Sequence, residues 1–219
     1  MQRRFRVEWL LMMALLPPAL WWLQRSPGLA QIDLTAYDHV MSQARATPSP
    51  DILVVGIDQR SLDALGPWPW PRSLHALLLE RLAPMEPKSV LLDLFLDTPS
   101  EDPEEDHLLA QAMTRVPVYL PLSYTGQLDA SLDDTPGFRE PLPEFARSAK
   151  ALGHVNITRD ADGVARRMFL REGLRGQLQD YLGWILASGH PERDIVIAPS
   201  RQRADGWQMQ GEFGIPPVS

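Results

Sequence analysis

Four aspartates lie at or close behind the carboxyl ends of apolar runs and could gather at one edge of a sheet. Asp58 and Asp93 lie at the carboxyl ends of two apolar runs, with Asp97 and Asp106 close behind. Ligands of open parallel sheets bind outside the carboxyl ends of the strands, so these carboxylates are expected to form an acidic pocket. Carboxylate oxygens suit Mg²⁺, Ca²⁺ or a cationic ligand. The alternative is that each aspartate caps the helix or turn that follows it.

Polar side chains in other segments extend this set. Arg72 opens a predicted helix, His154 and Asn156 belong to the run Gly-His-Val-Asn, and Arg167 follows Arg166 on a predicted strand. A lone histidine on a strand is more often a hydrogen-bonded structural residue than a ligand-binding one. The two arginines can pair with the acids or bind an anion, but neighbours on a strand alternate faces, so only one should reach a shared site. The ligand-binding candidates are Asp58, Arg72, Asp93, His154, Asn156 and Arg167.

The motif Trp68, Pro69, Trp70, Pro71, Arg72 stands directly before the predicted helix. Each tryptophan is held between prolines, whose fixed backbone angle makes the segment rigid. We expect an apolar bulge that serves either as a packing plug or as the wall of a ligand pocket.

The sequence predicts no catalytic residue, because no nucleophile has an evident base partner. The candidates are scattered: Ser61, Ser73, His75 and His107. A cofactor is not expected, and a divalent cation stays a possibility, with Asp58, Asp93 and Asp106 as its candidate ligands. An anchored or secreted metal-dependent hydrolase that uses these three carboxylates is the alternative function.

Alternating strand and helix patterns predict the architecture of the first half of the body. The runs 52–57, 89–96 and 116–123 read as buried strands, and 72–82 and 102–115 read as the helices between them. Asp102 before Pro103 is typical of a helix start. The expected fold is α/β: a mostly parallel sheet with helices on both faces, plus an antiparallel hairpin, preceded by an N-terminal transmembrane helix.

The second half is predicted to be less regular. Residues 124–141 have no period and form a loop or an edge insertion, followed by a brief helix at 143–150. Strands at 152–158 and 164–171 are expected to form the hairpin, because Asp162-Gly163 suits its turn better than the beginning of a calcium loop. A helix at 178–187 and a strand at 195–198 are predicted last.

The N-terminus carries the signals of a membrane segment. Residues 7–23 form an apolar run of about 25 Å as a helix, with Trp9, Trp21 and Trp22 near its ends. Three arginines precede it, which places that end in the cytoplasm and exports the rest. We interpret the run as an uncleaved anchor, with a cleaved signal peptide as the alternative. The predicted domains are 1–24 (basic tip and transmembrane helix), 25–50 (amphipathic connector helix, with its helical pattern at 33–45) and 51–219 (extracytoplasmic domain).

Composition excludes several classes of protein. The net charge of -7 argues against a nucleic-acid partner, since phosphate binding needs clustered cations. The absence of cysteine rules out disulfides, thiolate metal sites and a cysteine nucleophile.

Several segments, taken in chain order, resemble the type 2 CHASE domain, the extracellular sensor of histidine kinases and nucleotide cyclases. The likeness covers about residues 33–190 and is carried by these elements: Tyr37-Asp38, Arg45, Val54 to Asp58, Ser61-Leu62, Leu65-Gly66, Trp68 to Arg72, Asp93, Phe95, Asp106, Leu120-Pro121, Leu152 to Asn156, Asp160 to Gly163 and Arg166-Arg167. The resemblance implies a receptor tethered in the inner or plasma membrane by one N-terminal pass, with its sensor in the periplasm or outside the cell.

This chain departs from the family pattern because neither returning membrane helices nor a kinase or cyclase follows the sensor. We therefore expect a fragment or a truncated product. The function expected from the resemblance is detection of a small molecule or ion by a homodimer that associates through residues 7–45, in a two-component or cyclase signalling system. A purely structural envelope module is the third possibility.

Overall fold

A computed structural model describes residues 9, 12–18, 21, 27–43, 49–124, 137–160, 162–174, 177–188, 201–202 and 207–214. The chain divides into two compact units, residues 1–52 with 216–219 and residues 53–215. Each unit is described by itself.

The first unit contains helix α2, Pro27–Gln43. This helix begins earlier than the predicted 33–45, at a proline whose fixed backbone angle suits a first helical turn. Residues 12–18 are also helical and exposed, whereas much of the predicted membrane run 7–23 falls outside the described residues. In the part of the chain that the structure describes, no helix has both the length and the apolar composition of a membrane crossing.

A parallel sheet forms one side of the second unit. Strand β2 (Val118–Tyr124) lies in parallel between β1 (Val90–Leu91) and β4 (Ala151–His154), and its last two residues pair in antiparallel fashion with β3 (Phe138–Arg139). The crossovers from β1 to β2 and from β2 to β4 contain the helices α5 and α6. This arrangement confirms the predicted parallel α/β character of the region.

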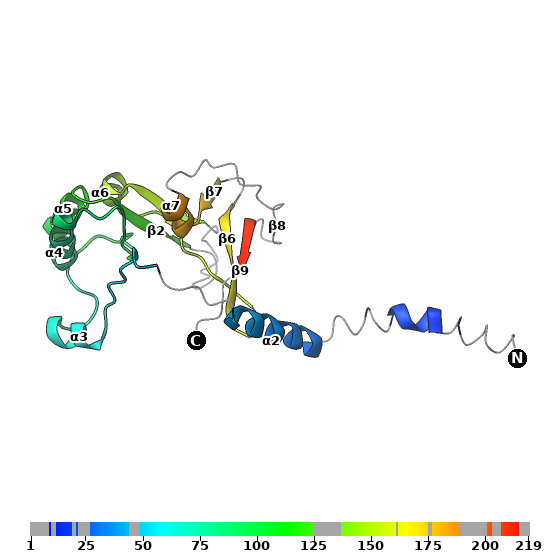
Figure 1. The fold of residues 1–219 in the computed structure, drawn as a ribbon. Coiled ribbons are helices and arrows are strands. Elements are labelled where there is room, and N and C mark those ends of the chain that lie inside the picture. Colours follow the sequence, from blue (N-terminus) through cyan, green and yellow to red (C-terminus); the bar gives the residue numbers. More distant parts are fainter. Residues whose placement is uncertain are drawn as a thin grey trace, which may run out of the picture. The chain divides into compact units, whose positions relative to one another are not determined.

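Three helices lie side by side in this unit (Figure 1). Helix α4 (Arg72–Leu82) packs against α5 (Pro103–Met113), and α5 packs against α6 (Pro143–Ser148). A short 3₁₀ turn, η1 (Ala83–Met85), extends α4. The core is made of apolar side chains from these helices and the strands: Ala76, Leu79, Leu92, Leu96, Leu109, Ala110, Ala112, Met113, Val116, Val118, Leu120 and Phe145.

Two of the predicted helix starts have a clear local cause. Asp102 accepts a hydrogen bond at Oδ1 from the Glu104 N–H (3.0 Å), and Pro103 follows it, so α5 begins where the sequence predicted. Pro143 likewise opens α6. Proline has no N–H to leave unpaired in a first helical turn.

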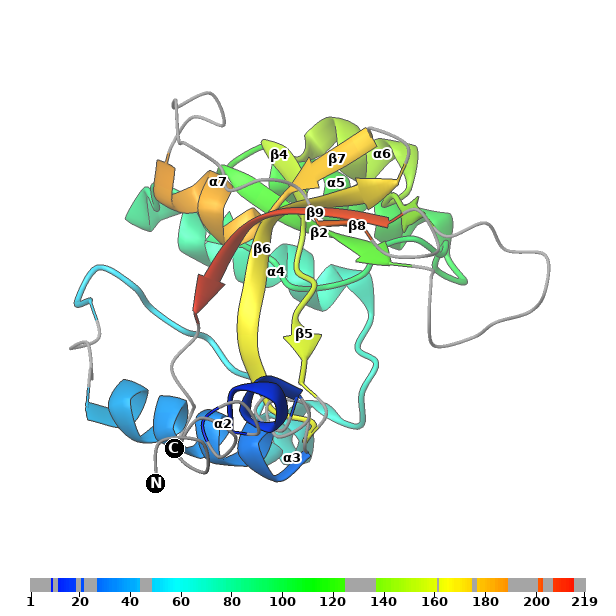
Figure 2. The ribbon, with the colours of Figure 1, turned by 90° about the vertical axis from the view of Figure 1, so that its right-hand side faces the viewer.

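An antiparallel sheet forms the rest of the second unit. Its long strand β6 (Ala165–Leu174) pairs with β5 (Thr158–Arg159), β7 (Gln177–Asp180) and β9 (Trp207–Gly214), and β9 pairs with β8 (Arg201–Gln202). Helix α7 (Leu182–Ser188) contacts β2 and β4. Figure 2 shows β6 and β9 running alongside each other.

The predicted hairpin turn is confirmed. The Asp160 N–H donates to the Val164 carbonyl (2.9 Å), and Gly163 adopts a φ of 82°. That dihedral is costly for a residue with a Cβ atom, so the Asp-Gly pair fixes this turn.

Four element predictions are wrong. Residues 52–57 are extended but pair with no described strand, and α3 (Gln59–Leu65) follows them. The predicted strand 89–96 shortens to β1, because the Leu94 N–H turns back to the Leu92 carbonyl (2.8 Å). Residues 152–158 contain two short strands, β4 and β5. The predicted helix 178–187 begins later, as α7, because residues 177–180 pair with β6 and form strand β7. The predicted strand 195–198 lies outside the described residues.

Candidate functional site

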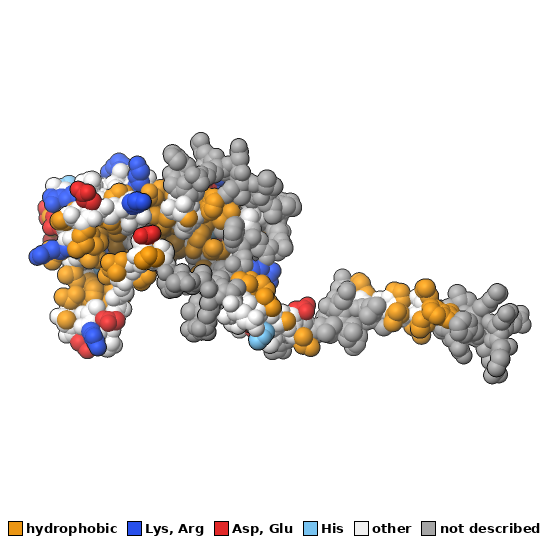
Figure 3. All heavy atoms as spheres, viewed as in Figure 1, with side chains coloured by type: hydrophobic (Ala, Val, Ile, Leu, Met, Phe, Trp, Pro, Cys, Tyr) orange, Lys and Arg blue, Asp and Glu red, His pale blue; other side chains and the backbone are white. Residues whose placement is uncertain are grey.

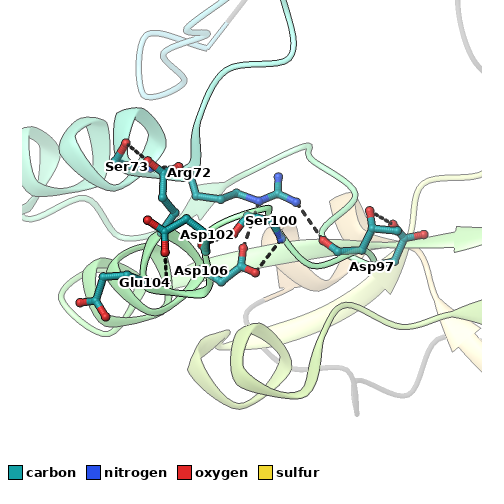
Figure 4. Close-up of polar contacts among 9 residues, drawn as sticks. Arg72, Ser73, Asp97, Ser100, Asp102, Glu104 and Asp106 are labelled. Carbon is teal, nitrogen blue, oxygen red and sulfur yellow. Dashed lines mark hydrogen bonds and ion pairs between the residues drawn. The ribbon is translucent and has the colours of Figure 1, made fainter.

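A buried ion pair joins the starts of α4 and α5. Arg72 is the first residue of α4, and its Nε lies 3.4 Å from Oδ1 of Asp106, which is 2 % exposed in the first turn of α5. The other carboxylate oxygen accepts a hydrogen bond from the Ser100 N–H at 2.8 Å. Figure 4 shows both contacts on the same carboxylate. The Arg72 guanidinium thus compensates the negative charge of Asp106, which would be costly to bury without a partner.

Further polar contacts extend this cluster on either side. The Arg72 Nη2 donates to the Thr98 carbonyl (3.3 Å), and the Ser73 hydroxyl donates to Glu105 Oε1 (2.7 Å). Each contact ties the first turn of α4 to α5 or to the loop before it. The geometry therefore gives Arg72 a positioning task, and its predicted role in ligand binding stays a prediction.

The Trp-Pro motif leads directly into this cluster. The Trp68–Pro69 peptide is cis, and the Trp70 Nε1 donates to the Gly66 carbonyl (2.8 Å). The Trp68 ring is half exposed and meets the buried His75 ring edge-on, at 5.7 Å between centroids. Burial and the nearby positive charge of Arg72 lower the pKa of His75. The two tryptophan rings thus lie against His75 in the first turn of α4.

His154 occupies the carboxyl end of β4. Its side chain is 0 % exposed and lies between the rings of Phe138 (6.2 Å) and Tyr181 (5.5 Å). Neither ring nitrogen makes a hydrogen bond of normal geometry with a described residue, although the Leu170 carbonyl, which accepts from the Tyr181 N–H at 2.7 Å, lies near enough to act on the imidazole. Burial lowers the pKa of His154 to about 4, against a smaller raising effect of the Leu170 carbonyl. The imidazole is therefore neutral at pH 7, with one donor and one acceptor nitrogen.

The residue before His154 must be glycine for steric reasons. A Cβ atom on Gly153 would lie 2.8 Å from the Asp180 carbonyl oxygen, which is closer than carbon and oxygen can approach. The close contact between β4 and the end of β7 therefore explains the glycine of the Gly-His-Val-Asn run. Tyr181, which forms an isolated bridge with His154, directly follows β7.

Asn156 also meets a buried partner. Its Nδ2 donates to Oε2 of Glu172 (2.9 Å), a carboxylate that is 4 % exposed on β6. Glu172, Tyr181 and Phe138 were not among the predicted site residues. Glu172 lies one position beyond the predicted strand 164–171, and its partner Asn156 lies on a separate element, so no local signal marked it.

The two arginines that were predicted to pair with acids or bind an anion lie at the start of β6, just after the hairpin turn. Asp160 accepts from the Arg166 Nη1 (3.0 Å) and the Arg167 Nη2 (2.8 Å), so the expectation that only one could reach a shared site is wrong. Asp160 lies on the turn itself, beyond the strict alternation of the strand. Arg166 also pairs with Asp162 at 2.7 Å, and this bond is the main reason that the pKa of Asp162 falls to about 2.

The acidic pocket is not assembled. Asp58 caps α3 by accepting from the Ser61 N–H (2.9 Å) and hydroxyl (2.8 Å), and these bonds lower its pKa. Asp93 is exposed, and Asp106 pairs with Arg72. Asp97 lies 3.3 Å from Arg139. Within the described residues no three His, Cys, Asp or Glu side chains are placed to hold a metal ion, so the capping alternative describes Asp58 correctly.

Comparison with known families identifies the domain. The family model of the CHASE2 domain matches residues 12–202, which is most of the chain. No match is found among curated proteins or among solved structures. The chain therefore belongs to the CHASE2 family, a family of sensory extracellular domains rather than of enzymes.

Proposed function

We propose that this chain is the extracytoplasmic sensor of a membrane-bound receptor. The observation that carries the proposal is the family match across residues 12–202. The arginines and the apolar run of residues 1–24 support an uncleaved membrane anchor, with the body in the periplasm or outside the cell. The output would be a cytoplasmic kinase or nucleotide cyclase, and the receptor would act as a homodimer.

The surroundings of His154 are the best-supported place for detection of a small molecule or ion. Buried polar groups normally have hydrogen-bond partners, so a buried imidazole whose nitrogens make no hydrogen bond of normal geometry with a described residue can bind a polar ligand. The residue stands at the carboxyl end of a parallel strand, where ligands of such sheets bind. A small polar ligand that offers both a donor and an acceptor would match a neutral imidazole.

Signalling requires that the ligand bind two conformations with different affinity, since equal affinity shifts no equilibrium. The Asn156–Glu172 pair, which links the segment after β4 to β6, is a candidate for a contact that differs between them. The hydrolase alternative needs Asp58, Asp93 and Asp106 in one cluster, and no observation favours it over the sensor.

Thermal unfolding with added probes tests the proposal. Suitable probes are single amino acids, acetate, inorganic phosphate, Mg²⁺ and Ca²⁺. We expect one class of probe to raise the unfolding temperature, and His154→Leu to reduce that shift. His107→Leu is the matched control, because His107 is exposed on α5. Turnover of a phosphate monoester with Mg²⁺, or no stabilisation by any probe, would contradict the sensory function.

A further inference from the structure

The exposed run, defined as residues 52–57, is unusual because an apolar segment lies exposed to solvent. It reads Ile-Leu-Val-Val-Gly-Ile, a pattern typical of a strand buried on both faces. Its apolar side chains are nevertheless 46–84 % exposed: Ile52, Leu53, Val54, Val55 and Ile57. Figure 1 shows it as extended chain leading to α3, which lies away from α4, α5 and α6. A continuous apolar surface of this kind marks a place where another surface binds.

Strand β1 offers an unused edge in the same unit. The N–H groups of Val90 and Leu92 donate towards β2, to the carbonyls of Pro117 (2.9 Å) and Tyr119 (3.1 Å). Since alternate residues of a strand point their N–H groups to opposite sides, the Leu91 N–H points away from β2. No described strand pairs with β1 on that side. An unpaired edge of this kind is a template for another strand.

The elements around this edge also expose apolar side chains. Leu91 on β1 and Phe95 just after it are 45 % and 52 % exposed, and Leu77 on α4 and Met85 in η1 are 46 % and 73 % exposed. Hydrophobic side chains are visible over α4 and along the chain towards α3 (Figure 3). A strand added beside β1 would cover apolar surface on both partners.

The order of the elements fits one more parallel strand. Helices α4, α5 and α6 pack in chain order, and β1, β2 and β4 follow in the same order, so α5 and α6 each connect neighbouring strands. Helix α4 has β1 after it, but no paired strand before it among the residues that the structure describes. Residues 58–89 include α4 and are long enough for a right-handed crossover between parallel strands.

We propose that residues 52–57 dock in parallel against the unused edge of β1, as a fourth parallel strand of the sheet. The structure records the undocked arrangement. The occupant is this segment of the same chain, because its crossover has the form of the two crossovers that follow it.

Docking has a consequence for signalling, and this step alone rests on the proposed sensory function. The boundary between the two units falls at residue 52, so the exposed run begins at that boundary in the chain. Docking would carry Asp58 to the carboxyl end of the sheet, beside Asp93. A change between docked and undocked forms would then alter that edge of the sheet.

Disulfide crosslinking tests the docking, and the absence of cysteine gives a clean background. Two double variants of the full chain are compared, Val54→Cys with Leu91→Cys and Val55→Cys with Leu91→Cys. Neighbouring strands lie within disulfide reach, and the side chains at 54 and 55 point to opposite faces. Docking predicts that one pair crosslinks within the monomer and the other does not. A crosslinked dimer would assign the edge to a second copy, and equal or absent crosslinking of both pairs would also overturn the proposal.

Amide hydrogen exchange gives a second measurement that a folding defect cannot imitate. Docking predicts protection at alternate amides between Leu53 and Ile57, and loss of that protection in Leu91→Pro. The Leu91 N–H does not bond to β2, so β2 should stay protected in the variant and report an intact fold. Rapid exchange throughout residues 53–57 of the unmodified chain would overturn the proposal.

Discussion

Strand β2 and the exposed run of residues 52–57 lie in opposite environments. Val118, Leu120 and Leu122 on β2 are at most 2 % exposed, whereas Val54 in the exposed run is 84 % exposed. Both segments are apolar and extended. Strand β2 has β1 and β4 as neighbours, and helices α5 and α6 belong to its two crossovers. Burial of an apolar strand thus depends on its pairing partners. For the exposed run, the proposed partner is the unused edge of β1.

The largest effect is expected from truncating β2. Leu120→Ala should lower the free energy of unfolding by about 3 kcal/mol, because it leaves a cavity in the core. Val54→Ala is the matched change in the exposed run and should cost about 1 kcal/mol if that run docks at the sheet edge. Urea unfolding of both variants measures the difference. No loss in Val54→Ala would place the exposed run permanently outside the sheet, and equal losses would place it in the core.

A second large effect is expected from His154 under acid conditions. Its pKa is lowered from 6.5 to about 4 by burial, so the unfolded chain binds a proton more readily between these values. Stability should therefore fall as the pH drops from 6.5 to 4, by up to about 3 kcal/mol. His154→Leu should flatten this part of the profile, measured by urea unfolding at each pH.

His75 also has a lowered pKa and contributes a slope in the same direction, so the difference between wild type and variant is the relevant quantity. Identical pH profiles for the two proteins would contradict the buried, neutral state of His154.

A moderate effect is expected at the buried ion pair. Asp106→Asn should cost about 2 kcal/mol, because it removes the charge that faces the Arg72 guanidinium. Asp97→Asn is the control, since its partner Arg139 is 55 % exposed at the side chain and such pairs contribute less than about 1 kcal/mol. Thermal unfolding of the two variants compares them. If Asp97→Asn proved the more damaging, the tie between α4 and α5 would not depend on Asp106.

The smallest effect is expected at the hairpin turn. Hydrogen bonds from Arg166, and then from the Val164 N–H, lower the pKa of Asp162 from 3.8 to about 2. The ionised carboxylate therefore contributes stability above pH 4 that is lost as the pH falls towards 2. Asp162→Asn should reduce the slope in this window, measured by urea unfolding at each pH. An unchanged slope in Asp162→Asn would contradict the pairing with Arg166.

The features that could be predicted from the sequence are those with a local cause. Asp102 before Pro103 marks the start of α5, and Asp162-Gly163 marks the hairpin turn, because each depends on residues a few positions apart. The contacts that could not be predicted join distant segments. Arg72 and Asp106 are 34 positions apart, and Asn156 and Glu172 are 16 apart.

The aspartates illustrate the same limit. Asp58 and Asp93 follow apolar runs with similar composition, and the prediction of a shared pocket assumed that both runs pair in one sheet. Only the second run contributes a paired strand, β1, so the two carboxylates are not brought into a metal-binding group. The aspartate at each position indicated a polar role, but the distance between the two carboxylates depended on which strands pair.

This CHASE2 domain is proposed to work on the outer side of a membrane. Labelling of a single cysteine tests this placement, since the sequence has no cysteine of its own. Glu101→Cys places a thiol at an exposed position, and a membrane-impermeant maleimide is added to bacterial spheroplasts before and after lysis. Full labelling is expected before lysis. Labelling only after lysis would place the domain in the cytoplasm and contradict the sensory function proposed for it.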